Sequence, residues 1–230
     1  MGHILPTYYF SGEYENLYPE LLTLEHTEKV FHKGDFLWTI GEPITTVYYF
    51  RSGIAETYVE HEKGHRKILS FHGAGTIFPG MQKSHYKIEN AMVIQALTDV
   101  AVTAFKREDF YQFSLRNPAL MDRLIEHQSA YINMLIYDVA HQRYNYTFLK
   151  LCNFLFLMAE NNRDGSHSVA ITQENIANLL GVGRNHVTKC LSRLRQENII
   201  KVQRGCIHIL DFDRLAAYCS QETQKTASSR

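Results

Sequence analysis

The sequence predicts an α+β protein with an N-terminal β-roll of jelly-roll type, then a long helix, then a C-terminal winged helix-turn-helix. Three features support this prediction: short strand-like runs between glycines up to Phe105, a heptad-patterned segment after Pro118, and two amphipathic segments joined by Gly181-Val182-Gly183. Short strands with glycine turns are typical of sandwiches and barrels, and a glycine break between two amphipathic helices is typical of a helix-turn-helix. We expect segments at residues 1–115, 116–144 and 145–230.

The strand-like runs are brief and rich in β-branched and aromatic residues. We expect a helical patch at residues 18–24 and strands at residues 36–38, 46–50, 54–60, 67–71, 92–96 and 100–105. A roll alone is also compatible with a cupin-like metal enzyme, for which His61, His65 and His72 are the candidate ligands. Cupins need His-x-His and a Glu on adjacent strands, whereas Glu62 and Gly64 indicate a turn here. We therefore interpret these histidines as residues of a hairpin loop, not as metal ligands, and expect no bound metal ion.

The distribution of charged residues indicates which class of partner the protein binds. The 24 Lys and Arg residues balance 24 Asp and Glu residues, but the charges are segregated. Residues 166–210 carry six basic and two acidic residues, whereas residues 1–115 carry ten basic and fourteen acidic residues. The basic excess thus coincides with the helix-turn-helix, as expected for DNA binding.

The sequence also favours a cytoplasmic protein without a membrane partner. It shows no signal peptide and no apolar run of membrane-spanning length. The four cysteines, Cys152, Cys190, Cys206 and Cys219, lack metal-ligand spacing, which favours burial in a reducing compartment.

The segment after Asn117-Pro118 has the start signal and the heptad pattern of a long helix. Apolar and amide residues recur at alternating spacings of four and three, which predicts a dimer seam of coiled-coil type. The seam comprises Met121, Ile125, Gln128, Ile132, Leu135, Val139 and Gln142. A second apolar side comprises Leu120, Leu124, Tyr131 and Met134 and would cover the roll. The alternative is one helix buried on two sides within a monomer.

Two short amphipathic helices are expected between Ile171 and Leu194, after a helix at residues 146–160 and a strand at residues 168–171. The second helix leaves Arg184, Asn185, Thr188 and Lys189 on its outer face, where they suit base edges. Arg193, Thr172 at the preceding cap, and Lys201 and Arg204 in the following hairpin suit phosphates. That hairpin, residues 199–203 and 206–210, is the wing. Asp211 should cap a last helix, and residues 221–230 are expected to fray.

In this order the chain resembles the Crp/Fnr superfamily of bacterial transcription regulators. The matching segments are Lys33-Gly34-Asp35, Gly41-Glu42, Arg51-Ser52-Gly53, residues 72–80, and Ile171 to Ala177 with Gly181. The resemblance implies a homodimer that binds palindromic double-stranded DNA, with its recognition helices about 34 Å apart. It also implies an effector domain in the roll, and contact with RNA polymerase if the protein activates genes. A ligand-binding module that does not bind DNA is the remaining alternative.

The resemblance also bears on cofactors. Glu89 stands near the position where cyclic-nucleotide-binding members have an Arg for the phosphate, and Leu135 and Ile136 replace hydroxyls that contact the base, so we do not expect cyclic AMP. The oxygen-sensing members use N-terminal cysteines for an iron–sulfur cluster, but no cysteine precedes Cys152. Haem would need axial ligands such as His72, His85 or His127, and a lone histidine is more often a packing residue. We expect no cofactor.

Gly41 to Thr45 and Gln196 to Ile200 are similar to the regulators of halorespiration, which bind phenol-bearing acids between roll and helix. This similarity implies a small organic anion as effector. Its counter-charge would be Lys83 or Lys87, and its apolar walls would be Phe71, Met81, Tyr131 and Met134. Asn185 departs from better-known members of the superfamily, which carry Glu there. Glu accepts a hydrogen bond from cytosine, whereas Asn pairs with adenine, so we expect a different operator base.

Overall fold

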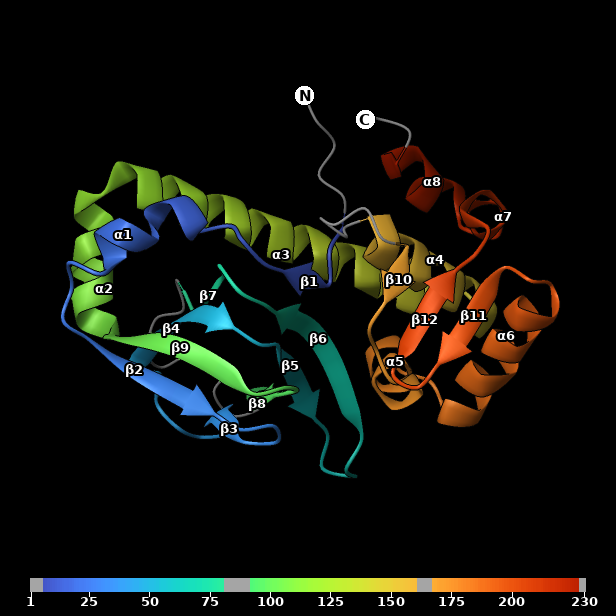
Figure 1. The fold of residues 1–230 in the computed structure, drawn as a ribbon, viewed down its shortest axis with the longest axis horizontal. Coiled ribbons are helices and arrows are strands. Elements are labelled where there is room, and N and C mark those ends of the chain that lie inside the picture. The colour runs from blue at the N-terminus through green and yellow to red at the C-terminus, as the bar shows by residue number, and fades with distance from the viewer. Residues whose placement is uncertain (1–5, 81–91, 161–166, 228–230) are drawn as a thin grey trace. The chain divides into compact units, whose positions relative to one another are not determined.

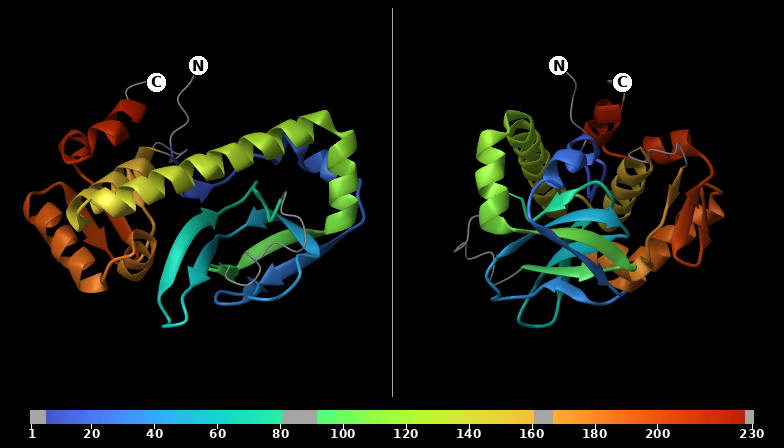
Figure 2. Two further views of the ribbon diagram at one scale, coloured as in Figure 1. Left: turned by 180° about the vertical axis from the view of Figure 1, so that it is seen from behind. Right: turned by 60° about the vertical axis from the view of Figure 1, so that its left-hand side comes forward.

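The computed structural model describes residues 6–80, 92–160 and 167–227 and consists of two compact units. The division falls within the long helix α3 (Pro118–Tyr144), between Tyr131 and Ile132. Figures 1 and 2 show α3 as one continuous helix between α2 and the connector before α4. The order of a β-roll, a long helix and a helix-turn-helix confirms the predicted fold class.

The N-terminal unit is a roll of two facing sheets (Figure 1). One sheet has the order β1-β6-β5-β8-β3 and the other β2-β9-β4-β7. The strands are β1 (Tyr9–Phe10), β2 (His26–Phe31), β3 (Phe36–Trp38), β4 (Thr46–Ser52), β5 (Ala55–Glu60), β6 (Arg66–His72), β7 (Ile77–Phe78), β8 (Met92–Ala96) and β9 (Val100–Lys106). Buried residues of both sheets, among them Phe50, Ile94 and Val102, form one core.

All six expected strands are present, and β1, β2 and β7 are additional. Strand β2 pairs with β9 along its whole length, from His26 opposite Phe105 to Phe31 opposite Val100. Four of its residues are exposed and two are charged, so it lacks the alternation that identifies a half-buried strand. Strand β1 pairs in parallel with β6, and its Tyr9 hydroxyl occupies the place of a side chain at Gly73.

Helices close one side of the roll. They are the 3₁₀ helix η1 (Glu15–Leu17), α1 (Tyr18–Leu21), α2 (Arg107–Arg116) and the first part of α3. Leu120 and Leu124 of α3 are fully buried in a core with Val47, Tyr49 and Phe105. The predicted second apolar side of the helix therefore covers the roll over this part of its length.

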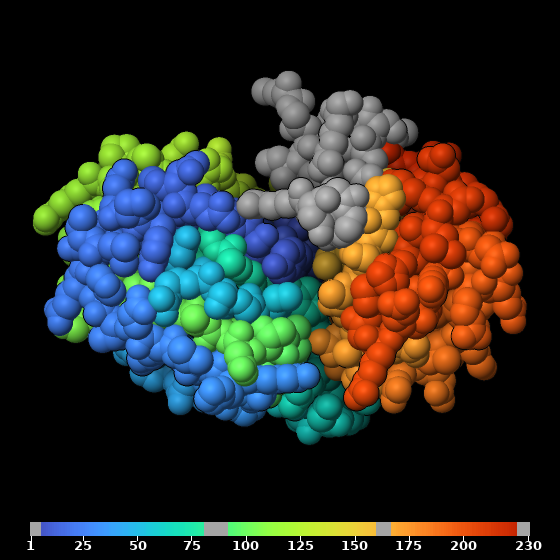
Figure 3. Space-filling model, viewed as in Figure 1, coloured from blue at the N-terminus to red at the C-terminus, as the bar shows by residue number. Residues whose placement is uncertain are grey.

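The C-terminal unit contains the second part of α3 and a winged helix-turn-helix. Its elements are α4 (Thr147–Glu160), β10 (Ser168–Val169), α5 (Gln173–Leu180), α6 (Arg184–Gln196), β11 (Ile200–Gln203), β12 (Cys206–Ile209), α7 (Phe212–Ala217) and α8 (Gln221–Ala227). Strands β10, β12 and β11 form an antiparallel sheet, and Asp211 caps α7 by accepting from the Arg214 amide. The gaps between the ribbons of each unit in Figure 1 are filled by side chains in the space-filling view of Figure 3.

The expectation that the chain frays from Gln221 is wrong for residues 221–227, which form α8. Thr223 is fully buried, and its hydroxyl lies 2.9 Å from the hydroxyl of Tyr137 on α3. Ser220 contacts Thr223 and also accepts from the side-chain amide of Asn153 on α4. Polar residues dominate α8, so hydropathy gave no sign that hydrogen bonds would hold it against α3 and α4.

No helix in the described ranges has the length and apolarity needed to span a membrane.

Two predicted helix starts are confirmed within a residue, at Pro118 for α3 and at Thr147 for α4.

Candidate DNA-reading face and effector-sensing core

The turn between α5 and α6 follows directly from the sequence. Thr172 caps α5, since its hydroxyl accepts from the Asn175 amide at 3.1 Å. Gly181 ends α5 with φ of 62° and ψ of 38°, a left-handed conformation that glycine adopts without steric cost. Gly183 then caps α6 in an extended conformation. The two helices are therefore joined by a turn too short to let them move apart.

The inner face of α6 is buried, and this fixes which side chains face outward. Val187, Leu191 and Leu194 are at most 2% exposed, and α6 packs against both α4 and α5. All four residues predicted to read bases lie on the opposite side and are exposed: Arg184, Asn185, Thr188 and Lys189. Arg184 and Thr188 also contact side chains of α5.

The four candidate phosphate contacts differ in their exposure and in whether their side chains already make contacts within the protein. Lys201 of β11 and Arg204 of the wing turn are exposed. Thr172 is exposed, but its hydroxyl is already engaged as the cap and also donates to the Asn175 side chain. Arg193 donates to Glu197 at 3.0 Å, and its guanidinium lies 4.2 Å from the centre of the Phe148 ring. The structure thus gives Arg193 a role within the protein in addition to its predicted one.

The predicted dimer seam is the exposed side of α3. Ile125, Ile132 and Val139 are 54%, 53% and 70% exposed, although large apolar side chains are usually buried. Met121, Gln128 and Leu135 are half-buried. Ile136, at 63%, adds to the same apolar exposure. An exposed apolar stripe at heptad spacing is typical of a helix that pairs with a second helix.

The inner face of β6 is polar where it meets α3. Strand alternation puts Ser70 and His72 on the same face. The ring of His72 lies 4.3 Å from that of Phe78, and Nε2 of His72 lies 3.0 Å from the Ser70 hydroxyl. Tyr131 of α3 shares a side-chain hydrogen bond with Ser70 and lies 5.7 Å from the Phe10 ring. The residues beside Tyr131 are therefore Ser70 and Phe10.

The predicted effector residues are only partly placed. Alternation along β6 puts Phe71 on the face opposite Ser70 and His72, so the structure does not bring Phe71 to the Tyr131 side. Met134 is buried. Met81, Lys83 and Lys87 lie outside the described residues, as does Glu89, so the predicted cationic side of the pocket and the argument against cyclic AMP stay predictions.

His72 and His127, which the sequence offered as haem ligands while packing was the more common role expected of a lone histidine, are both buried. His127 of α3 lies 4.8 Å from the Phe10 ring and 5.7 Å from the Tyr14 ring. Burial lowers the pKa of His127 to about 4. Burial, and then the nearby His127, lower the pKa of His72 well below its ordinary value. Both imidazoles are therefore neutral near pH 7, and neither Nδ1 has a hydrogen-bond partner among the residues that the structure describes.

Of the three histidines considered for a cupin-like site, only His61 and His65 lie near each other, with ring centres 6.5 Å apart. His61 and His65 flank an exposed hairpin turn, where the His61 amide donates to the His65 carbonyl at 2.8 Å. His72 is fully buried at the far end of β6. Across the described residues no group of three His, Cys, Asp or Glu side chains has metal-binding geometry. The four cysteines are free thiols, of which Cys152 and Cys219 are buried.

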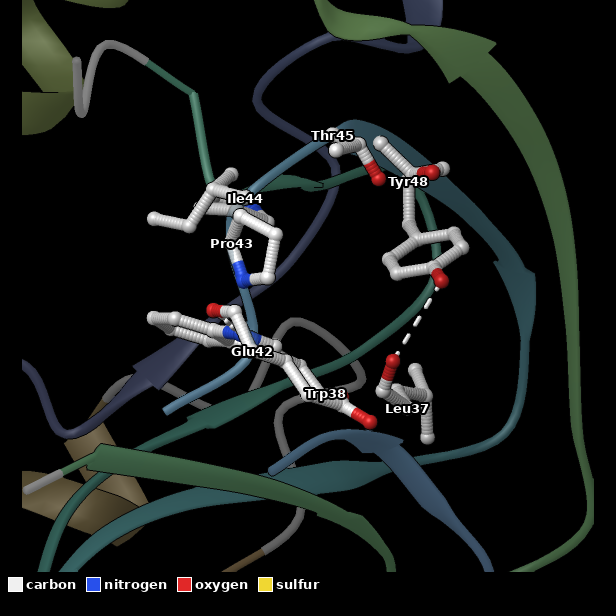
Figure 4. A pocket seen from close by; sticks show the side chains of 9 residues that line it. Leu37, Trp38, Glu42, Pro43, Ile44, Thr45 and Tyr48 are labelled. Atoms are coloured by element: carbon white, nitrogen blue, oxygen red, sulfur yellow. Dashed lines mark hydrogen bonds between the residues drawn. The ribbon is translucent and has the colours of Figure 1, made fainter. Parts of the chain in front are cut away.

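A small pocket of about 90 Å³ lies beside the Gly41 to Thr45 turn (Figure 4). Side chains of the flanking strands hold this region. The indole of Trp38 in β3 donates to the Glu42 carbonyl at 2.8 Å, and the Tyr48 hydroxyl of β4 donates to the Leu37 carbonyl of β3 at 3.3 Å. Ligand sites for drug-sized molecules occupy roughly 300–1,000 Å³. We therefore regard this pocket as part of the turn's packing and not as the effector site.

Two family models match separate parts of the chain. Residues 28–117 match a cyclic nucleotide-binding domain, and residues 149–218 match a Crp-like helix-turn-helix domain. These ranges correspond to the roll with α2, and to the segment from α4 to the end of the wing and α7.

Individual relatives agree with the models. The chain is 27% identical over 197 residues to the transcriptional activator protein anr of Pseudomonas aeruginosa, covering 80% of this chain and 77% of that protein. It is 24% identical over 201 residues to the transcriptional regulatory protein btr of Bordetella pertussis, covering 83% and 80%. The structure of FixK2 from Bradyrhizobium japonicum has a TM-score of 0.76 at 19% identity over 86% of this chain and 98% of that one. OCPA-complexed CprK has a TM-score of 0.68 at 15% identity, over 93% and 98%.

The buried His127 predicts an acid-dependent loss of stability in the roll. Between pH 6.5 and about 4 the unfolded chain protonates this imidazole while the folded roll keeps it neutral, so falling pH favours unfolding. At about 1.4 kcal/mol per pH unit, the free energy of unfolding of the wild type should fall by about 3 kcal/mol relative to His127→Phe across this window.

Urea unfolding at several pH values, followed by the fluorescence of Trp38, the single tryptophan of the chain, measures this difference. Comparison with His127→Phe cancels the titration of the carboxylates, which is common to both proteins. Above pH 6.5 the difference should not change with pH. A difference that stays constant down to pH 4.5 would show that His127 is not held neutral by the fold.

Proposed function

Because the chain belongs to the Crp/Fnr family of transcription regulators, we propose that it acts as a homodimer on palindromic double-stranded DNA under the control of a small effector. The observation that carries this proposal is the outer face of α6, where Arg184, Asn185, Thr188 and Lys189 are exposed together. Members of this family are DNA-binding regulators and not enzymes. Arginine is suited to guanine and asparagine to adenine, so this face offers hydrogen bonds that distinguish base pairs.

The exposed seam on α3 supports the homodimer. A single chain presents one recognition helix, whereas a palindrome requires two that are related by a twofold axis. Pairing of the two α3 helices along Ile125, Ile132 and Val139 would remove these side chains from water and supply that axis. In such a dimer, Lys201 and Arg204 of the two wings would contact equivalent phosphates in the two half-sites.

Replacement of Ile132 by Asp should convert the dimer into a monomer, because a buried unpaired carboxylate at the seam strongly disfavours association. Sedimentation velocity of the 26.7 kDa chain distinguishes the two states. Asn133→Asp adds the same charge at the adjacent exposed position and should leave the dimer intact. A wild-type protein that sediments as a monomer at all concentrations, or an Ile132→Asp protein that remains dimeric, would contradict the seam.

Asn185 gives the most specific prediction about DNA. Selection of duplexes from a random pool by the wild-type protein should yield a palindrome with adenine at one position of each half-site, since Asn pairs with the N6 and N7 edge of adenine. Selection with Asn185→Glu should move that position toward cytosine and leave the rest of the palindrome unchanged. If both proteins select the same sequence, Asn185 does not read a base.

We propose that the effector is a small organic molecule bound beside Tyr131 and the inner face of β6. The support is a structural neighbour, CprK, which forms a complex with OCPA, together with the aromatic and polar side chains that meet there. Ser70 and Tyr131 provide hydroxyls, and Phe10 provides an aromatic wall. A charge partner for an anion would come from Lys83 or Lys87.

A panel of phenolic carboxylic acids should therefore contain compounds that change the affinity for the selected duplex. Effector coupling in allosteric proteins is typically about 5- to 150-fold, so a change of at least about fivefold is expected in a fluorescence anisotropy titration. The same acids without the hydroxyl, and the same phenols without the carboxylate, serve as controls. Equal affinity with every compound would argue against gating by a phenolic acid.

A further inference from the structure

The first turn of α5 contacts the reading face of α6 at two points. Glu174 Oε2 lies 3.8 Å from Nε of Arg184, an ion pair between side chains that are 59% and 66% exposed. One residue earlier, Gln173 Oε1 accepts a hydrogen bond from the Thr188 hydroxyl at 2.8 Å. Two residues outside the recognition helix thus hold two of its four candidate base-reading side chains.

The contact to Arg184 is made through the nitrogen that guanine does not need. A guanidinium reads O6 and N7 of guanine with a fork of two N–H groups. Because Nε is the nitrogen that faces Glu174, the ion pair leaves the two terminal nitrogens able to supply that fork. The carboxylate therefore restrains the plane of the guanidinium without occupying its reading end.

The contact to Thr188 has a different consequence. The single hydroxyl hydrogen of Thr188 is directed to Gln173 or, at 3.1 Å, to the carbonyl of Arg184. In either case the hydroxyl hydrogen is donated to a protein acceptor. Thr188 can therefore present its methyl group and its oxygen lone pairs to DNA, but no hydrogen-bond donor. A methyl group suits the C5 methyl of thymine.

We propose that the first turn of α5 braces the reading face and that Glu174 is a specificity-determining residue that positions Arg184 for guanine. This inference rests on the proposed function of α6 in reading DNA. Glu174 itself donates no hydrogen bond, and as an anion near phosphates it weakens binding to every sequence equally. Glu174 therefore does not raise the affinity for DNA in general. It raises the ratio between the affinity for a site with guanine opposite Arg184 and the affinity for a site in which that guanine is replaced.

The test uses duplexes selected from a random pool by the full-length protein. The guanine read by Arg184 is identified as the half-site position at which Arg184→Lys loses selectivity. Anisotropy titrations then compare this duplex with one in which that guanine is replaced by adenine, for wild type and Glu174→Gln. The guanine-to-adenine affinity ratio should fall about threefold in Glu174→Gln, within the range that exposed ion pairs contribute.

Two further variants distinguish a positioning role of Glu174 from a general effect of removing a negative charge. Asp213→Asn removes one exposed carboxylate from the first turn of α7 in the same unit, and its ratio should equal that of the wild type. In an Arg184→Lys background, Glu174→Gln should have no further effect on the ratio, because there is no guanidinium left to orient.

An unchanged ratio in Glu174→Gln, or an equal fall in Asp213→Asn, would overturn the positioning role. These outcomes differ from failure of the proposed function itself, in which the wild type would select no sequence from the pool.

Discussion

Packing of Val187, Leu191 and Leu194 against the rest of the C-terminal unit fixes the rotation of α6 about its axis. Because the three side chains follow the period of the helix, burying them leaves one orientation in which Arg184, Asn185, Thr188 and Lys189 face solvent together. The turn at Gly181 and Gly183 allows little adjustment between α5 and α6. The reading face is thus a consequence of core packing, and the contacts from Gln173 and Glu174 refine it at the level of individual rotamers.

The long helix α3 has two different apolar surfaces. Leu120 and Leu124 are buried in the core of the N-terminal unit, whereas Ile132 and Val139 are exposed. A stripe of large apolar side chains that stays exposed is typical of a surface that contacts another molecule. The same helix thus belongs to both units, with a buried apolar surface in the first and an exposed one in the second.

The interior of the roll differs from an ordinary hydrophobic core where β6 meets α3. Ser70, His72 and Tyr131 bring polar atoms into a region otherwise lined by aromatic rings, and burial keeps the imidazoles of His72 and His127 neutral. Buried polar groups cost stability unless they are satisfied, so such a cluster is more typical of a site with a function than of simple packing. It lies beside the residue, Tyr131, that the sequence had placed in the effector pocket.

The sequence by itself determined the features that depend on local periodicity and on turn chemistry. The six expected strands, α3 with its exposed apolar stripe, the cap at Thr172 and the outward-facing residues of α6 all follow from spacings of two, three and four residues, or from a glycine at a turn. Only the tertiary structure decided the features that depend on pairing between distant segments. Strand β2 is held by β9 despite its polar sequence, and α8 is held by hydrogen bonds to Tyr137 and Asn153 despite its low hydropathy.

The same division applies to the sites. The similarity to the halorespiration regulators pointed to Phe71 as a wall of the effector pocket, but alternation along β6 places Ser70 and His72 on the side of Tyr131 instead, because adjacent residues of a strand face opposite sides. For α6, the sequence identified which side chains face solvent together. The ion pair of Glu174 with Arg184 and the bond of Gln173 with Thr188 were beyond its reach, since both depend on how the turn sets one helix across the other.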